Sequence, residues 1–373
     1  MDYFISNCTK LTSVDMSNLD TSKVKTMFAM FYLSSKLETI NFGNIKTSSL
    51  LNMQSLFNGC SGLISIDLSN FDTSKVTFMN YTFQGCSSLT SLNLSAFNTP
   101  EVKAMYSLFR ICSNLTSLDL TTFDTSKVRI MNHMFDNCKN LKIINLGNIN
   151  TSSVENMEFL FASCSKLTSF DLSLFDTSKV STMFAMFYAC SQLQYINFGN
   201  INTSSVKNMR SLFNGCSNLI SVDLSNFDTS KVTTFQWMFK GCSKLKFLNL
   251  SKIQTSKISN IYYMFENCKS LLFLNLYSFK LNVSINKTGD FKGISSFVRF
   301  CINDTDTKNL LLEKNKTSNC NDNCFQNDIK IDIAHNTCLK SCVNNGYKFE
   351  YNNICYNECP NYTYPLFCEK KLL

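Results

Sequence analysis

Residues 115–140 read LTSLDLTTFDTSKVRIMNHMFDNCKN, and variants of this stretch follow one another at a fixed interval of 26 residues. Phe, Leu, Thr and Cys columns share this interval with a Met column. The Met column consists of Met27, Met53, Met79, Met105, Met131, Met157, Met183 and Met209. Such regular spacing is typical of a solenoid, in which each repeat buries its apolar face only against its neighbours.

Each repeat is expected to form one coil made of a strand, a corner and a short helix. Leu118 and Leu120 flank the polar Asp119, which is the period of a strand with one buried face. From Val128 onward, apolar residues recur every three or four positions, which predicts an amphipathic helix. In another repeat, residues 99–101 read Thr-Pro-Glu, so the Thr column is expected to supply helix N-caps.

The stretch from Met134 to Val154 resembles the BspA-type leucine-rich repeat of microbial surface proteins, and the resemblance covers residues 1–280. It implies an α/β solenoid: a right-handed leucine-rich-repeat superhelix with a parallel sheet on one face and short helices on the other. It also implies a surface role in adhesion or recognition, and no catalytic residues. Phe71, Phe123 and Ile149 stand where many such repeats place asparagine, so apolar packing is expected to close this corner.

The composition agrees with a folded, extended array. Hydrophobic residues make up 44% of the chain, and only three prolines and eleven glycines interrupt it. The formal net charge is +8, but the lysines are interspersed with acidic residues and form no runs. Such a dispersed excess of positive charge is typical of a solvated surface, so no nucleic-acid partner is expected.

The eighteen cysteines form two groups. Ten occupy the repeat column, beginning with Cys8 and running from Cys60 to Cys268, with Ser34 in the place of the second. These are expected to be small buried side chains, a role that free cysteine fills well. In-register side chains on stacked coils point the same way, which suits disulfide torsions poorly.

The other eight cysteines lie in residues 301–373, which we expect to form a Cys-rich module after the solenoid (1–280) and a junction (281–300). This segment resembles the furin-like modules of eukaryotic surface proteins. An even count in a short, loop-prone stretch predicts four disulfides of unassigned pairing, with zinc as the alternative. Disulfides persist in oxidising compartments, so an extracellular or cell-surface location is expected. The eight are Cys301, Cys320, Cys324, Cys338, Cys342, Cys355, Cys359 and Cys368.

The two ends of the chain lack the signals that export and anchoring would need. No signal peptide precedes Met1, which is already in phase with Met27, and no apolar stretch approaches 20 residues. A solenoid end normally carries a polar cap. We therefore expect a fragment whose export signal and membrane anchor lie beyond it.

The sequence contains no pattern typical of catalysis. His133 and His335 are the only histidines, and they lie about 200 residues apart. There is no Gly-rich phosphate loop, no His-Glu-x-x-His and no Gly-x-Ser-x-Gly motif. We expect neither an enzyme, nor a cofactor, nor a metal site.

One outward strand column alternates strictly between Asp and Asn. The intervening amide would separate carboxylates that otherwise lie about 4.8 Å apart, so relief of repulsion is the preferred interpretation, with a ligand ladder as the alternative. Asp119, Asn145, Asp171 and Asn197 are its candidate binding residues. The column is Asp15, Asn41, Asp67, Asn93, Asp119, Asn145, Asp171, Asn197, Asp223 and Asn249.

A second outward column departs from the usual Ser and Thr, and it supplies the main binding candidates. The Ser117 position becomes Ile143, Tyr195, Phe247 and Phe273, flanked by Lys142, Gln194 and Lys246. Exposed apolar side chains on a strand face usually mark contacts. The alternative is that the Cys-rich tail folds back over Phe247, Leu272 and Phe273 as a cap.

Together these features predict a surface-displayed adhesion or recognition protein. Its expected partner is a protein or glycan on host or neighbouring cells, bound through the sheet face. A structural spacer that holds other domains away from the cell surface is the alternative, and an enzyme or a polyanion binder is a weaker one.

Overall fold

The structure is a computed structural model. It describes residues 1–282, 284–312 and 318–320, and the backbone alone of residues 330–332, 337–339, 349–351 and 354–356. The chain divides into two compact units. Unit 1 is Met1–Leu167 with Leu174–Ser191, and unit 2 is Thr168–Ser173 with Gln192–Leu373.

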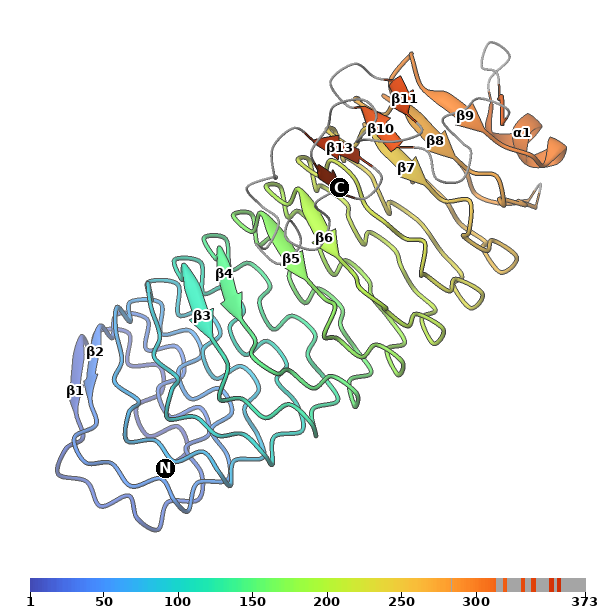
Figure 1. Ribbon diagram of the computed structural model, residues 1–373. Coiled ribbons are helices and arrows are strands. Elements are labelled where there is room, and N and C mark those ends of the chain that lie inside the picture. Colours follow the sequence, from blue (N-terminus) through green and yellow to red (C-terminus); the bar gives the residue numbers. More distant parts are fainter. Residues whose placement is uncertain are drawn as a thin grey trace. The chain divides into compact units, whose positions relative to one another are not determined.

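Unit 1 is a parallel β-solenoid whose short strands lie on one side of successive coils (Figure 1). The strands pair in register with the same positions of the next repeat, and the middle residue of each points inward. This register follows from the 26-residue repeat, because equivalent residues stack directly. The strands are β1 (Ser13–Asp15) with β2 (Thr39–Asn41), and β3 (Ser117–Asp119) with β4 (Ile143–Asn145).

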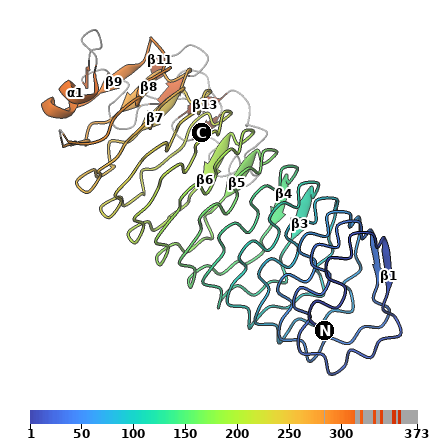
Figure 2. The same cartoon turned by 180° about the vertical axis from the view of Figure 1, so that it is seen from behind.

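Unit 2 repeats the same arrangement, and Figure 2 shows its strands from the opposite side. All of its repeat strands pair in parallel and in register. They are β5 (Ser169–Asp171) with β6 (Tyr195–Asn197), and the three-stranded sheet of β7 (Phe247–Asn249), β8 (Phe273–Asn275) and β9 (Arg299–Cys301).

The helices expected in each repeat are absent, and this prediction was wrong: α1 (Thr305–Leu311) is the only helix among the described residues. From Met131 to Cys138 the chain forms consecutive turns, with His133 and Asn137 at φ +58° and +62°. The N–H of His133 donates to the carbonyl of Glu158 in the next coil at 2.9 Å. In a chain of such turns, one side chain points to the interior every three or four residues. Its apolar residues therefore have the same spacing in the sequence as those of an amphipathic helix.

The Thr column does not cap helices either. Thr73 is buried, and its hydroxyl donates to the carbonyl of Asn98 at 2.7 Å while accepting the N–H of the same residue at 2.9 Å. The column therefore clamps each coil to the next, because one buried hydroxyl pairs with both backbone groups of a residue in the following coil. The same pair of bonds joins Thr47 to Asp72, Thr125 to Asn150, Thr229 to Gln254 and Thr255 to Lys280.

The core is a stack of aromatic rings. Phe135 is 1% exposed and stacks on Phe109 at 5.9 Å and on Phe161 at 5.4 Å between ring centroids. Phe71 and Phe123 are also buried, which confirms that apolar packing closes the corner. The nine repeat cysteines from Cys60 to Cys268 are free and buried, as predicted, whereas Cys8 is half-buried.

The stack continues past residue 280, where the sequence pattern fades. Within residues 281–300, Phe291 stacks on Phe265 at 5.7 Å, and β9 pairs with β8. The helix α1 follows, with the Asp304 carboxylate accepting the Thr307 N–H at its start. The array of stacked coils thus extends to about Cys301 in unit 2.

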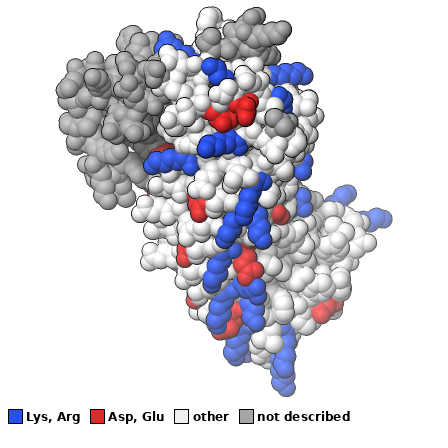
Figure 3. Space-filling model, turned by 90° about the vertical axis from the view of Figure 1, so that its right-hand side faces the viewer, with Lys and Arg blue, Asp and Glu red and all other residues white. Residues whose placement is uncertain are grey.

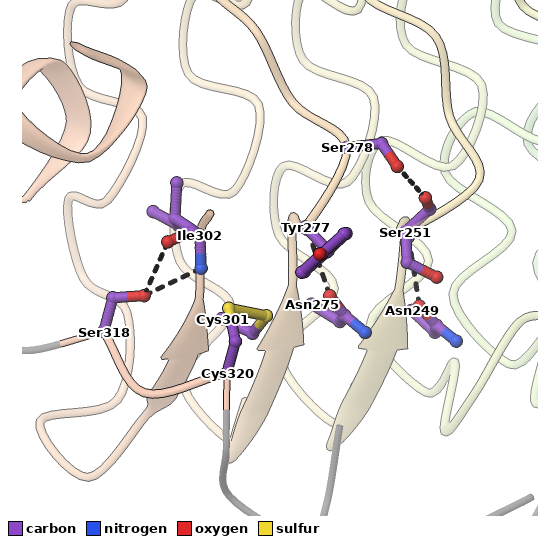
Figure 4. Close-up of a disulfide and its surroundings, with 9 residues drawn as sticks. All are labelled: Asn249, Ser251, Asn275, Tyr277, Ser278, Cys301, Ile302, Ser318 and Cys320. Atoms are coloured by element: carbon purple, nitrogen blue, oxygen red, sulfur yellow. Dashed lines mark hydrogen bonds between the residues drawn. A yellow bond between two sulfur atoms is a disulfide. The ribbon is translucent and has the colours of Figure 1, made fainter. Parts of the chain in front are cut away.

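One of the predicted disulfides is described: Cys301 at the end of β9 joins Cys320, with their Cα atoms 4.5 Å apart (Figure 4). Beside it, the Ser318 hydroxyl accepts the N–H of Ile302 and donates to its carbonyl. The side chains of the other six cysteines lie outside the described residues. A four-stranded sheet with the order β11-β10-β13-β12 comprises β10 (Lys330–Asp332), β11 (Thr337–Leu339), β12 (Phe349–Tyr351) and β13 (Ile354–Tyr356).

Candidate functional site

The outward strand positions of unit 1 form an exposed surface, which we call the strand face. Ile143 is 64% exposed, and among the first strand positions of unit 1 it is the one large apolar side chain. Lys142 is exposed beside it, and the Lys142 N–H donates to the carbonyl of Thr116 at 2.9 Å. The equivalent positions in the other coils of unit 1 are small, polar and exposed: Ser13, Thr39, Ser65, Ser91 and Ser117.

The Asp and Asn column closes the corner that follows each strand. The Asp119 carboxylate accepts the N–H of Thr121 at 3.0 Å, and this bond lowers its pKa. Asn145 accepts the N–H of Gly147 in the same way at 3.3 Å. The alternation also joins neighbouring coils, because in unit 2 the Asn197 amide donates to Asp171 at 2.9 Å. These four candidates therefore have structural partners, and the preferred interpretation of the alternation agrees with the geometry.

The expectation of an exposed aromatic row is wrong in unit 2, where Tyr195 and Phe273 are each only 2% exposed. Phe273 is enclosed by its own column: the Phe247 ring lies 6.5 Å away and the Arg299 guanidinium 5.4 Å from its ring. At the next coil after Tyr195, Ser221 is also buried. The alternative, in which the Cys-rich tail caps this column, falls on residues outside the described part of the chain and stays a prediction.

The remaining candidates in unit 2 are half-buried. Phe247 borders a hollow of about 90 Å³ together with Asn249 and Ser251. Lys246 directly precedes Phe247 in the sequence, and burial lowers the pKa of its amino group. The N–H of Gln194 donates to the carbonyl of Thr168 at 2.8 Å. This hollow is too small for more than a few water molecules.

Sequence reasoning missed an aromatic row in unit 1. It lies on what we call the turn edge, the side chains one and two places after the Met column. Five half-buried rings from successive coils contact one another there, with centroids 4.6–5.7 Å apart. In order, they are Tyr81, Tyr106, His133, Phe159 and Phe184.

A charged cluster lies beside this row. The buried carboxylate of Asp136 accepts the Nε–H of Arg110 at 2.9 Å and lies 2.9 Å from His133 Nδ1. An ionised carboxylate only accepts hydrogen bonds, so Nδ1 carries the hydrogen. Asn137 donates to its other oxygen at 2.7 Å. Asp136 therefore fixes both the Arg110 guanidinium and the His133 ring.

Unit 2 has a related cluster at equivalent repeat positions. The Arg210 guanidinium lies 4.5 Å from the Trp237 ring, and Lys240 Nζ lies 5.0 Å from the Tyr263 ring. Lys240 also pairs with Glu266 at 2.7 Å. Both clusters could have been predicted from the variation between repeats. On the turn edge the residue type changes from coil to coil, although the adjacent Met, Phe and Cys columns stay almost constant.

Basic side chains gather in rows on one face of the molecule (Figure 3). Two basic side chains of unit 1 are neutralised by the coil next to them: Lys127 pairs with Glu101 and Arg129 with Glu155, both at 2.7 Å. These side chains are about half exposed or more, so each pair contributes little to stability. The pairing also weakens the case for a polyanion site.

The described residues include neither a metal-binding cluster nor a membrane-spanning helix. No group of three or more His, Cys, Asp or Glu side chains is arranged to hold a metal ion in that part of the chain. The same residues include no helix with the length and apolar character of a membrane span.

The repeat, the stacked coils and the paired strands define a leucine-rich-repeat solenoid. The chain belongs to the family described as "Mycoplasma protein of unknown function, DUF285", whose model matches residues 1–117, 103–197 and 190–303. A comparison with curated proteins finds no match. The BspA-type and furin-like resemblances and the right-handed sense of the superhelix stay predictions.

Among solved structures, the chain is similar to bacterial leucine-rich repeat proteins. One from Bacteroides ovatus is 18% identical over 84% of this chain and 85% of its own, with a TM-score of 0.39. One from Eubacterium ventriosum is 16% identical over 77% and 84%, with a TM-score of 0.38. A leucine-rich cell surface protein from Faecalibacterium prausnitzii is 19% identical over 70% and 78%, with a TM-score of 0.33.

Proposed function

We propose that this chain is a non-enzymatic, extracellular or surface-displayed recognition protein that binds a partner on host or neighbouring cells across the strand face of unit 1. The observation that carries the proposal is the exposure of that face. Its side chains stand in ordered rows on a rigid scaffold, with Ile143 64% exposed among small polar neighbours. Solenoids commonly use such extended surfaces for binding.

The cysteine chemistry supports the proposed location. Cys301 and Cys320 are bonded, and structural disulfides persist in oxidising environments. A protein exported in this way meets other cells first, which suits a role in recognition.

A spacer is the second candidate, and one observation favours it. Apart from Ile143, the column of the strand face that contains it repeats Ser or Thr in unit 1, as a surface without a specific partner would. The two candidates differ in whether the chain itself binds cells.

The test replaces Ile143 and Lys142 together by Ser and Thr, the residues at the same repeat positions in the preceding coil. Binding of labelled protein to a cultured epithelial monolayer should fall at least about tenfold, equivalent to about 1.4 kcal/mol. Tyr195 is unsuitable for this test, because its burial means that a substitution would disturb packing.

The matched control is Leu174→Asn, which removes another side chain that is 65% exposed and restores the common residue of its own column. Equal binding by the Ile143 double variant and the wild type would contradict the proposal. No binding by either would favour the spacer, and loss of binding at modest salt in the wild type would favour a polyanion partner.

A further inference from the structure

The second place after the Met column has a left-handed backbone in every coil of unit 1, and three of the five turn-edge rings, together with Tyr3, occupy it although it disfavours bulky side chains. Tyr3, Tyr81, His133 and Phe159 have φ values of 56°, 60°, 58° and 52°, in the left-handed region where bulky side chains are uncommon. Glycine holds the same repeat position at Gly289 without this cost. Strained positions of this kind cluster at functional sites.

Core packing does not explain why aromatic residues occur there. Tyr3 is 55% exposed, and the other three are half-buried, whereas the rings of the core stack are almost fully buried. A side chain that is both strained and partly in water contributes little to folding. Ala29, Ser55, Ser107 and Ala185 show that the position also accepts small residues, so the occurrence of aromatic residues there points to a use for the exposed ring surface.

The row of rings is interrupted at one coil, and a hollow of about 270 Å³ lies there. Ala29 and Ser55 occupy, in two successive coils, the position that Tyr3 and Tyr81 hold in the coils on either side. Their small side chains leave the space open. Tyr3 and Phe28, which meet edge to face at 5.3 Å, line it together with Tyr81. The remaining lining residues are Tyr32 and Asn58.

The lining combines ring surfaces with hydrogen-bonding groups. Of its seven residues, the three tyrosines, Ser55 and Asn58 carry a hydroxyl or an amide, and only Phe28 and Ala29 are wholly apolar. An anchor pocket for a peptide side chain is predominantly apolar and free of water. A sugar presents both kinds of surface, because its C–H groups pack on the electron-rich ring face while its hydroxyls need polar partners.

We propose that this hollow binds a carbohydrate, with the ring row beyond it supporting further sugar residues of the same chain. The row continues through Tyr106, whose ring lies 4.8 Å from that of Tyr81. Arg110 stands beside it, with its side chain 35% exposed. Its Nε is held by Asp136, and within the described part of the chain no acceptor is bonded to its two terminal nitrogens. These nitrogens can donate to sugar hydroxyls or to a carboxylate.

The inference rests on the proposed recognition function and names the chemistry of one partner, on a surface distinct from the strand face. It is tested without cells, using the full chain and two soluble oligosaccharides. Chitohexaose is the neutral probe and a hyaluronan hexasaccharide the carboxylated one. Saturation-transfer NMR detects sugar protons that pack on the rings, and titration gives the dissociation constant.

The variant Phe28→Gln with Tyr81→Ser copies Gln54 and Ser55 of the coil between them, so the fold already accepts both residues at these positions. At least one oligosaccharide should receive saturation from the wild type, and the double variant should bind it at least about tenfold more weakly. Tyr277→Ser is the matched control. It removes a tyrosine that is 49% exposed, lies outside the hollow and has serine at the same position of the preceding coil, so binding should not change.

Arg110→Gln, which copies Gln84, separates the two sugar classes: it should weaken hyaluronan more than chitohexaose if a carboxylate is recognised. Melting curves check folding, and if the double variant is unstable, Tyr32→Asn, which copies Asn58, tests the same hollow. Absence of saturation transfer to both oligosaccharides, or wild-type binding by the hollow variants, would overturn the proposal. Either result would leave cell binding through Ile143 untouched, so the two proposals can fail separately.

Discussion

The Sγ atom of Cys138 lies 3.0 Å from the carbonyl oxygen of Phe109, one coil earlier. The same contact recurs between Cys164 and Phe135 at 3.2 Å. Where serine replaces cysteine, the Ser34 hydroxyl donates to the carbonyl of Ile5 at 2.6 Å. The Cys column is thus more than apolar filler: its weak S–H donor gives each buried carbonyl a partner.

Burial should make these thiols unreactive in the folded protein. It raises the pKa of Cys60, Cys190 and Cys268 to about 12, so almost no thiolate is present at pH 8. Iodoacetamide should label the half-buried Cys8 first, and the three buried thiols only after denaturation. Rapid labelling of the buried thiols in native protein, measured by mass spectrometry, would contradict this packing.

Phe135→Ala should destabilise the array by about 3–5 kcal/mol, because it leaves a cavity between two stacked rings. The effect should be greatest in adjacent coils, since each coil contacts only its neighbours. Chemical denaturation gives the cost, and hydrogen exchange locates it. A cost below about 1 kcal/mol would mean that this ring does not support the stack.

Thr73→Val should cost about 1–3 kcal/mol, because it removes two hydrogen bonds to the backbone of Asn98, each of which contributes about 0.5–1.5 kcal/mol. Valine keeps the shape of the side chain, so the change tests the hydrogen bonds. Thr90→Val is the control, since Thr90 is exposed. Equal unfolding free energies for the two variants would disprove the clamping role of the Thr column.

The acid Asp290 should make unit 2 less stable as pH rises. It is buried where other coils have residues such as Met264 and Leu212, and burial raises its pKa to about 8 from an ordinary value of 3.8. The folded state then binds the proton more tightly than the unfolded chain does. Its stability is therefore fully present below about pH 4 and decreases as pH rises toward 8.

The neutral variant Asp290→Asn should remove this decrease, so the free-energy difference between variant and wild type should grow from pH 5 to pH 8. Urea denaturation at the two pH values measures it. A difference independent of pH would show that Asp290 is ionised in the folded protein.

Peptide mapping of alkylated, non-reduced protein should recover the Cys301–Cys320 bridge. We expect three further bridges among the six cysteines from Cys324 to Cys368, and reduction should unfold this segment before the array. Free thiols or bound zinc there would remove the main support for an oxidising compartment.

The sequence by itself determined the repeat, the strand register and the inward columns. A strict 26-residue period can bury Phe109, Phe135 and Phe161 together only if equivalent residues stack, and the structure stacks them. Alternation around Leu118 likewise identifies the buried side of a strand. These features follow from local periodicity, which one repeat already contains.

Only the tertiary structure decided the turn segments and the recognition surfaces. Apolar residues at intervals of three or four positions fit a helix and a series of turns equally well. The turns form because backbone N–H groups such as that of His133 bond to the next coil, here to the carbonyl of Glu158. Alternation shows that Tyr195 points outward but not what packs on that side, so its burial could not be read from the sequence. The turn-edge rings are 25 to 27 residues apart in the sequence, and only the stacking of coils brings Tyr81, Tyr106 and His133 into contact.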